Sequence, residues 1–180
     1  MIPHMKPNDM KMFYRYLDNA TVYFEFGSGG STYQASIRDN IKRIYSVESD
    51  ISWQERLKNT IKSDKVTYIY NEMDTRPNTW GHPGPNSTEE QRRNYSSHLV
   101  DGVDLIFIDG RFRVACCLKA YEAGCLVIFD DFLNRSHYHV VLEYFDIVER
   151  TSDETMVVLK PKDGKVIPRH LIDKYELVVH

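Results

Sequence analysis

The stretch from Val22 to Ser36, VYFEFGSGGSTYQAS, limits most strongly what this chain can fold into. An apolar run of strand character leads into three glycines within four residues, and a helical pattern follows. Bare backbone between the first strand and the first helix of an α/β sheet lets a ligand approach the main chain closely. The stretch therefore predicts a ligand crevice at the carboxyl edge of a sheet. A tight turn that binds nothing is the alternative.

Short apolar runs alternate with segments of helical period along the rest of the chain. This alternation is typical of a doubly wound α/β fold, a mostly parallel sheet with helices on both faces. The length of 180 residues and the hydrophobic content of 42% suit one core, so we expect a single domain over residues 1–180. The strands are predicted over residues 21–26, 43–47, 65–70, 103–108, 125–129 and 155–159.

Apolar residues at helical spacing predict helices between these strands. Asp50 stands where the helix that carries Trp53 needs an N-cap, and Gly124 stands where a later helix needs a left-handed cap. The recurring apolar positions are Tyr33, Ile37 and Ile41, then Trp53, Leu57 and Ile61, then Val114, Cys117, Leu118 and Tyr121.

The segment from Asn71 to Leu99 has no such pattern and is dense in Pro, Gly, Asn and Ser around Trp80. Long loops of this kind in compact domains are usually binding loops or lids, or else disordered. We therefore expect a loop that faces the substrate, with Trp80 as a candidate acceptor contact and disorder as the alternative.

The charge balance indicates which partners to expect, and the cysteines indicate the compartment. With 23 basic and 26 acidic residues the formal net charge is −3, and the basic residues are scattered, so we expect no nucleic-acid partner. The cysteines Cys116, Cys117 and Cys125 lie in apolar segments, which is typical of a reducing, cytoplasmic compartment. No apolar run approaches the roughly 18 residues of a membrane span, and the first residues do not resemble a signal peptide. The oligomeric state stays open, with a homodimer as one option.

The glycine turn and two carboxylates indicate which ligand the crevice takes. The turn reads Gly-Ser-Gly-Gly-Ser-Thr, so Thr32 stands where the dinucleotide fingerprint G-x-G-x-x-G has its third glycine. Glu25 just before the turn would repel a diphosphate and suits a cation. Glu48, at the end of the second strand, stands where a carboxylate can accept hydrogen bonds from both ribose hydroxyls, unless it is only a solvated charge. S-adenosylmethionine has a ribose, a sulfonium cation and no phosphate, so it fits better than NAD.

The sequence resembles the class I S-adenosylmethionine-dependent methyltransferases from about Thr21 to Leu159. The resemblance is carried by FEFGSGGST, YSVESDISW, VDLIFIDGRFR and CLVIFDDF. It implies a Rossmann-like, three-layer α/β/α fold with a seven-stranded sheet that is parallel except for an antiparallel last strand. The segment DIVERTSDETMVVLKPK resembles the hairpin that closes the family's sheet.

The family pattern implies a set of cofactor contacts. Glu48 would bind the ribose, Asp74 the adenine, and Asp109 with Gly110 would lie near the sulfonium. The contacts expected around the methionine moiety and beside the ribose are Glu25, Gly27, Ser28, Gly29, Thr32 and Ser49.

An acidic triplet, Asp109, Asp130 and Asp131, follows two strands that we expect to be neighbours. Three converging carboxylates would repel one another unless a cation lay between them. Such hard oxygen ligands suit Mg²⁺, Mn²⁺ or Ca²⁺, and the site resembles that of catechol-type and sugar-type O-methyltransferases, in which these positions hold magnesium. We therefore predict a metal site at the triplet, with strand-end caps and no metal as the alternative.

A metal ion would bind two adjacent acceptor hydroxyls and lower the pKa of one. Where the catechol enzymes carry a lysine, this chain has Arg111 and Arg113, and arginine is a poor general base. Proton removal would then fall to an aspartate, to water, or to His137 or His139. The predicted catalytic residues are Asp109, Asp131 and His137.

The acceptor is predicted from the planar donors and the aromatic ring near the triplet. Arg111, Arg113, Arg135 and Tyr138, with Trp80, suit a hydroxyl-rich or carboxylate-bearing acceptor such as a sugar. IDGRFRVACCLKAY and FDDFLNR resemble a group of small methyltransferases of bacteria and large algal viruses, some associated with methylating glycan sugars such as rhamnose.

We therefore expect O-methylation of a sugar hydroxyl on a glycan or glycoside. The alternatives are a methyltransferase of a small non-sugar molecule or of a protein, a nucleoside-binding module without turnover, and an NAD-dependent oxidoreductase. The Asn/Asp-Pro-Pro-aromatic stretch that many N-methyltransferases carry after the fourth strand is replaced here by Ile-Asp-Gly-Arg.

Overall fold

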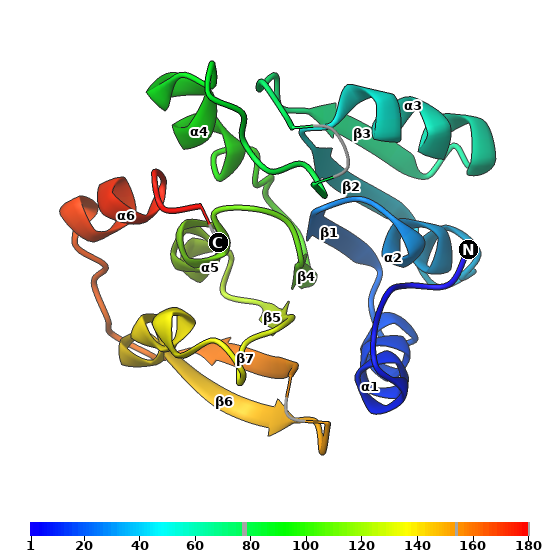
Figure 1. The fold of residues 1–180 in the computed structure, drawn as a ribbon. Helices are drawn as coiled ribbons and strands as arrows, with labels where there is room; N and C mark the ends of the chain where they lie inside the picture. Colours follow the sequence, from blue (N-terminus) through cyan, green and yellow to red (C-terminus); the bar gives the residue numbers. More distant parts are fainter. Residues whose placement is uncertain (77–78, 154, 180) are drawn as a thin grey trace.

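A computed structural model describes residues 1–76, 79–153 and 155–179. It contains a seven-stranded sheet with the strand order β3-β2-β1-β4-β5-β7-β6 (Figure 1). The strands are β1 (Val22–Phe26), β2 (Arg43–Glu48), β3 (Val66–Tyr70), β4 (Leu105–Ile108), β5 (Leu126–Phe129), β6 (Phe145–Arg150) and β7 (Val157–Pro161).

The sheet is parallel from β1 to β5, whereas β7 lies between β5 and β6 and runs antiparallel to both. This confirms the predicted Rossmann-like fold with a closing antiparallel hairpin. Phe26 of β1 is paired with Val47 of β2 and with Ile108 of β4, and Ile108 is paired with Phe129 of β5. Because these parallel strands end in register, the residues that follow them meet along one edge of the sheet.

Helices cover both faces of the sheet (Figure 1). The side chains of the central strands alternate between the two faces: Phe24 and Phe26 join the hydrophobic core with α5, whereas Tyr23 and Phe107 join the core with α1. The helices are α1 (Pro7–Leu17), α2 (Gly30–Ser36), α3 (Ile51–Thr60), α4 (Glu89–Tyr95), α5 (Arg113–Ala120) and α6 (Arg169–Tyr175), with 3₁₀ segments η1 (Tyr121–Ala123) and η2 (Ser136–Glu143).

The predicted strands and caps are confirmed, with strand ends that agree to within two residues. The Asp50 carboxylate accepts the N–H of Trp53 at 3.0 Å, and Gly124 ends η1 with a φ of 66°. The helix that follows the glycine turn is shorter than predicted, because α2 ends at Ser36. Ile37 is therefore 57% exposed, and Ile41 is buried from the loop beyond the helix.

The loop predicted from Asn71 to Leu99 contains a helix, α4, while its residues 77 and 78 lie outside the described residues. The Thr88 hydroxyl accepts the N–H of Gln91 at 3.1 Å, and the Gln91 side chain accepts the N–H of Thr88 at 3.0 Å. This reciprocal pair is a capping box, and Thr-x-x-Gln was a readable signal for it. The prediction of a loop without pattern was wrong over α4, because it rested on composition alone.

The predicted burial of the cysteines is confirmed for Cys116 and Cys117, whereas Cys125 is partly exposed; all three are free thiols. Burial raises the pKa of each thiol above its ordinary value. In the part of the chain that the structure describes, no helix has both the length and the apolar character needed to cross a membrane.

Candidate active site

The turn after β1 approaches the turn after β4 very closely. Gly27 has a φ of 96°, a left-handed conformation that favours glycine. A Cβ atom on Gly27 would lie 2.8 Å from both the Cα and the N atom of Gly110, and one on Gly110 would collide with the hydroxyl of Tyr95. Packing therefore explains why both positions are glycine.

Gly29 is different, because nothing in the fold crowds it. Its backbone is extended, with a φ of 174°, and a Cβ placed on it would meet no atom within 4 Å. At Gly30, by contrast, a Cβ would strike the backbone of Ile2 and Pro3. Open space beside bare backbone is what a ligand that contacts the main chain requires.

Glu25 supports the glycine turn from inside the protein. Its carboxylate is 0% exposed and accepts hydrogen bonds from the hydroxyls of Ser46 at 2.6 Å, Tyr23 at 2.9 Å and Thr32. Thr32 is also fully buried and accepts the N–H of Gly29 at 2.8 Å. Burial raises the pKa of Glu25 above its ordinary value. The cofactor contacts predicted for Glu25 and Thr32 are not supported, since both side chains lie beneath the turn.

The turn is also attached to its neighbours through Ser28. The Ser28 hydroxyl lies 2.6 Å from the hydroxyl of Ser46 on β2, and the Ser28 carbonyl accepts the indole N–H of Trp53 at 2.9 Å. Trp53 therefore holds the turn against α3. The sequence predicted Trp53 only as part of a helix face, because its partner is a backbone atom far away along the chain.

Glu48 lies at the end of β2, directly beside the turn. One carboxylate oxygen accepts the N–H groups of Ser49 at 2.7 Å and Asp50 at 2.9 Å, and the other accepts the N–H of Ser28 at 3.3 Å. The side chain is 8% exposed, and burial raises its pKa to about 7. A carboxylate next to a glycine turn at the end of the second strand matches the position predicted for a ribose acceptor.

The segment from Thr79 to Gly81 covers this carboxylate. A Cβ on Gly81 would lie 3.1 Å from the Ser49 hydroxyl and 3.4 Å from a Glu48 oxygen. The Arg111 guanidinium holds the segment by donating to the carbonyls of Thr79 at 3.0 Å and Trp80 at 2.7 Å. A ribose could reach both Glu48 oxygens only if this segment moved aside.

The predicted acceptor contacts of Arg111 and Trp80 are not supported in this arrangement. The Nη2 group of Arg111 holds the covering segment, since it donates to two carbonyls of the protein itself. The Trp80 side chain is 80% exposed, and its ring lies against that of His4 with centroids 5.7 Å apart.

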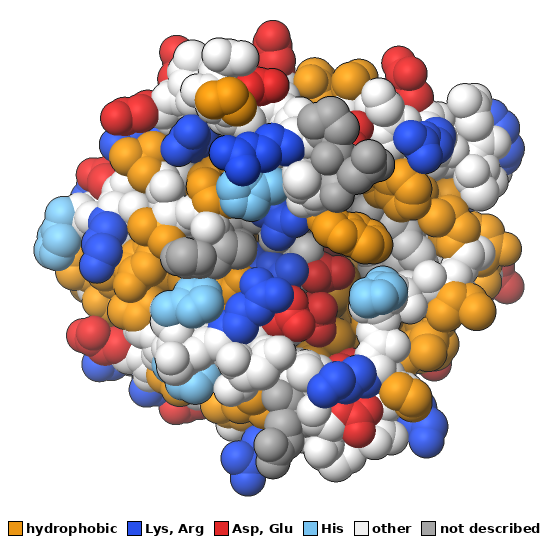
Figure 2. Space-filling model, viewed as in Figure 1, with side chains coloured by type: hydrophobic (Ala, Val, Ile, Leu, Met, Phe, Trp, Pro, Cys, Tyr) orange, Lys and Arg blue, Asp and Glu red, His pale blue; other side chains and the backbone are white. Residues whose placement is uncertain are grey.

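Asp109, Asp130 and Asp131 meet at the carboxyl ends of β4 and β5, as predicted. Burial, and then the charges of the other two carboxylates, raises the pKa of Asp130 to about 8, and burial also raises the pKa of Asp109. Figure 2 shows acidic and basic side chains gathered near the centre of the face that it draws. Two of the three carboxylates, those of Asp109 and Asp131, are paired with cations beside them.

Those cations are arginines. Arg113 is 5% exposed and turns its guanidinium to the protein, with four hydrogen bonds and a further ion pair. They reach the carbonyls of Asp109, Gly110 and Asp130 at 2.9–3.1 Å, the Asp109 carboxylate at 2.9 Å and the Asp131 carboxylate at 3.3 Å. Arg135 forms a second ion pair with Asp131 at 2.8 Å. The predicted contact of Arg113 with the acceptor is not supported in this arrangement, because the side chain is buried and engaged with the protein.

A divalent metal does not fit the triplet in this arrangement. Asp131, one of the three predicted ligands, is already held by Arg113 and Arg135. Within the described ranges, no group of three His, Cys, Asp or Glu side chains could hold a metal ion. The predicted metal site is therefore not supported in this arrangement.

Three further predicted residues have contacts with other parts of the protein. Tyr138 is fully buried, and its hydroxyl accepts a hydrogen bond from Arg135 at 3.1 Å. His137 is exposed on η2 with its ring 4.4 Å from that of Tyr138. Asp74 organises its own loop, since its carboxylate accepts the N–H of Asn86 at 2.9 Å. These settings give no support to the acceptor, catalytic and adenine roles predicted for them.

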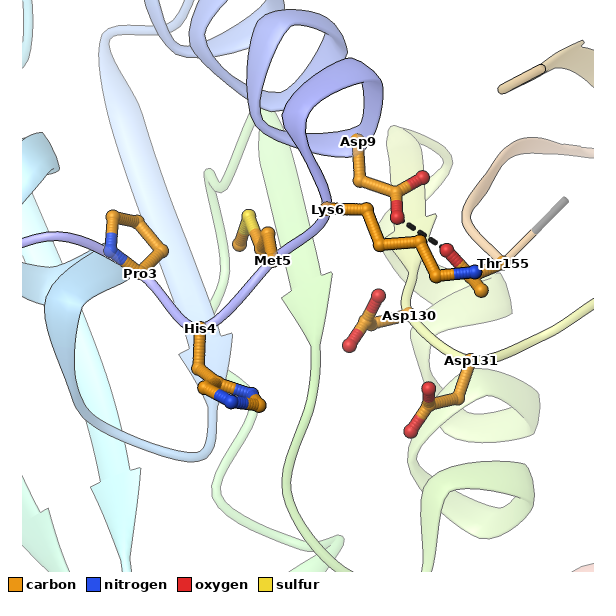
Figure 3. Close-up of a pocket in the computed structure, with 8 residues that line it drawn as sticks. All are labelled: Pro3, His4, Met5, Lys6, Asp9, Asp130, Asp131 and Thr155. Carbon is orange, nitrogen blue, oxygen red and sulfur yellow. Dashed lines mark hydrogen bonds between the residues drawn. The ribbon is translucent and has the colours of Figure 1, made fainter. Parts of the chain in front are cut away.

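A cavity of about 400 Å³ lies beside the acidic triplet (Figure 3). One wall is the N-terminal segment before α1, and the other is the end of β5. The sequence did not predict that residues 3–6 line this cavity, because their local pattern gives no signal of it. The lining residues are Pro3, His4, Met5, Lys6, Asp9, Asp130, Asp131 and Thr155.

Comparison with known proteins identifies the fold. No family model matches the chain, and no curated protein matches it. Among solved structures, this chain is similar to a methyltransferase-like protein from Silicibacter pomeroyi, with a TM-score of 0.79 and 23% sequence identity. The alignment covers 96% of this chain and 94% of the Silicibacter protein.

Two other structures show the same likeness at lower similarity. A Staphylococcus aureus protein assigned as a caffeoyl-CoA O-methyltransferase has a TM-score of 0.53 at 16% identity, covering 89% and 86% of the two chains. An Escherichia coli protein assigned as a methyltransferase has a TM-score of 0.57 at 9% identity, covering 92% of each chain. The fold of this chain is therefore the Rossmann-like fold of the class I methyltransferases.

Two glycine variants separate packing from ligand binding. Gly27→Ala should lower the free energy of unfolding by at least ~2 kcal/mol, because its φ is positive and Gly110 leaves no space. Gly29→Ala should change stability by less than ~1 kcal/mol, yet weaken binding of S-adenosylhomocysteine about tenfold or more. Urea unfolding and calorimetry measure the two effects, and equal affinity in Gly29→Ala would contradict the assignment of the open space to a ligand.

Glu48 should make the stability of the ligand-free protein depend on pH. Its pKa is raised from 4.5 to about 7, so the folded protein binds this proton more tightly than the unfolded chain does. The free energy of unfolding should therefore fall as the pH rises from about 4.5 to about 7, by up to ~3 kcal/mol. Urea midpoints at several pH values should show this share of the pH dependence missing in Glu48→Gln, and identical profiles would contradict it.

Proposed function

We propose that this chain is a methyltransferase that uses S-adenosylmethionine to methylate a sugar hydroxyl of a glycan or glycoside. One juxtaposition carries the proposal: open space beside Gly29, next to the Glu48 carboxylate, at the ends of two adjacent parallel strands. Ligands of open α/β sheets bind at this edge. The fold shared with methyltransferase structures supports the same reading.

The crevice residues suit the methyl donor. The backbone from Gly27 to Gly29 would approach its methionine end, and Asp109 with Gly110 would lie near its sulfonium. Glu48 would accept hydrogen bonds from its ribose once the segment from Thr79 to Gly81 has moved aside. The donor supplies a methyl carbon that is activated by a positively charged sulfur. Carboxylates at the ends of β2 and β4 favour this cation and disfavour the diphosphate of NAD.

The acceptor is inferred from the polar groups beyond Asp109. The carboxylates of Asp130 and Asp131 line the cavity next to the crevice, and carboxylate oxygens accept hydrogen bonds from sugar hydroxyls. The motifs around Asp109 and Asp130 resemble those of sugar-directed methyltransferases, which supports the same acceptor class. We place no step of the transfer on a metal ion, because Asp109 and Asp131 are already paired with Arg113 and Arg135.

Binding of S-adenosylhomocysteine tests the donor assignment. Calorimetry should show binding of this compound and none of NAD. Glu48→Ala should weaken it about 30-fold, because two hydrogen bonds of about 1 kcal/mol each are lost. Glu55→Ala, which changes an exposed glutamate on α3, is the matched control and should bind as the wild type does. Tight binding of NAD alone would overturn the proposed function.

Methyl transfer should not require a divalent metal. Labelled methyl donor and a panel of methyl glycosides should give the same rate in excess EDTA as in Mg²⁺, because Asp109 and Asp131 already have arginine counterions. Titration of Mg²⁺ into the protein should give no binding heat. A rate that EDTA abolishes and Mg²⁺ restores would show that the arginines give way to a metal.

A further inference from the structure

The N-terminal segment from Met1 to Lys6 is held across the carboxyl edge of the sheet. At one end the backbone of Ile2 and Pro3 packs on Gly30, and the Met1 carbonyl accepts a hydrogen bond from Gln34 on α2 at 2.9 Å. At the other end the Lys6 ammonium donates to the carbonyl of Asp153 at 3.1 Å. The segment therefore joins the glycine turn to the β6–β7 turn.

Between these two attachments the segment forms one wall of the cavity. Figure 3 shows His4 and Met5 on this wall and the carboxyl groups of Asp130 and Asp131 on the wall formed by the end of β5. Asp130 also connects the cavity to the crevice, because its N–H bonds the carbonyl of Ile108 at 3.1 Å beside Asp109. The cavity thus opens next to the position expected for the reactive methyl group.

Most charged groups that line the cavity already have partners in the protein. The buried Asp9 carboxylate accepts the hydroxyls of Thr151 and Thr155. Lys6 donates to a carbonyl, and Asp131 is paired with Arg113 and Arg135. His4 instead has a ring contact with Trp80 and an exposed side chain. Imidazole is a base whose pKa lies near physiological pH, which makes it suited to accept a proton during turnover.

We propose that this cavity is the acceptor site, that it takes a small polyhydroxylated acceptor of sugar size, and that His4 accepts the proton of the attacking hydroxyl. This inference rests on the proposed function. The acceptor oxygen forms a bond to the methyl carbon while the carbon–sulfur bond breaks. The electron pair of the broken bond stays on sulfur. The hydroxyl proton moves to the neutral imidazole of His4, so S-adenosylhomocysteine and a methyl ether are the products.

The lining favours a sugar over a planar aromatic acceptor. Pro3 and Met5 offer an apolar surface to the C–H face of a sugar ring, and the two aspartates offer acceptors to its hydroxyls. Among the eight lining residues the imidazole of His4 is the only aromatic ring. A volume of about 400 Å³ lies within the range of about 300–1,000 Å³ that is usual for small-molecule sites.

The geometry favours His4 over the histidines that the sequence suggested. His139 has a ring nitrogen 3.0 Å from the carbonyl of Phe132, and its ring packs on that of Phe132. His137 lies on η2 and is not among the residues that line the cavity. The arginines nearby stay protonated and cannot act as the base.

The test compares His4→Ala and His4→Gln with the control His170→Ala, which changes an exposed histidine on α6. Each protein is assayed with labelled methyl donor and methyl glycosides of the common hexoses and 6-deoxyhexoses, and binding of S-adenosylhomocysteine is measured by calorimetry. We expect at least one glycoside to be methylated, with kcat about 100-fold lower or more in both His4 variants. Affinity for S-adenosylhomocysteine should be retained in all of them, which also shows that they fold.

The pH profile separates a proton acceptor from a structural residue. Wild-type kcat should rise with pH as the base loses its proton, and this rise should be absent in both His4 variants and present in His170→Ala. A lowered kcat that keeps the rise would overturn the role of His4. Retained S-adenosylhomocysteine binding without methylation of any glycoside would overturn the acceptor class, whereas loss of that binding in the wild type would overturn the proposed function itself.

Discussion

The buried guanidinium of Arg113 is the interaction on which the functional edge of the sheet depends. Its donors reach three backbone carbonyls and two carboxylates at the ends of β4 and β5, so one side chain fixes the relative position of both turns. A charge taken out of water is tolerated only when it is paired and its hydrogen bonds are satisfied. Asp109 and Asp131 are therefore also the counterions of this arginine, and the shape of the edge follows from that pairing.

The carboxylates along the edge have different roles, and their surroundings explain the difference. Glu25 receives only internal hydroxyl groups and supports the glycine turn, whereas Glu48 receives backbone N–H groups and stands beside the space next to Gly29. Asp109 and Asp130 lie where the crevice meets the cavity. Glu25 thus supports the turn, Glu48 stands where a ribose would bind, and Asp109 and Asp130 form an acidic wall. This arrangement is consistent with a cationic donor on one side and a hydroxylated acceptor on the other.

Much of the fold could be predicted because its signals are local. Apolar runs of strand length, the Asp50 cap and the glycines after β1 depend on residues within a few positions of one another. The candidate site could be predicted only in part. Glu48 and Asp109 follow strands whose order the family pattern implies, but the partners of Glu25 and Arg113 come from other elements, and no spacing in the sequence indicates that their donors and acceptors are already used.

By itself the sequence determined a doubly wound sheet with bare backbone and carboxylates at one edge, because periodicity and glycine placement are written along the chain. Only the tertiary structure decided which of those charged groups face a ligand. The residue type alone does not tell whether an arginine or an aspartate is paired, because pairing depends on which strands end side by side. His4 reaches the functional edge only because the N-terminal segment packs on Gly30, a contact between distant residues that no local pattern encodes.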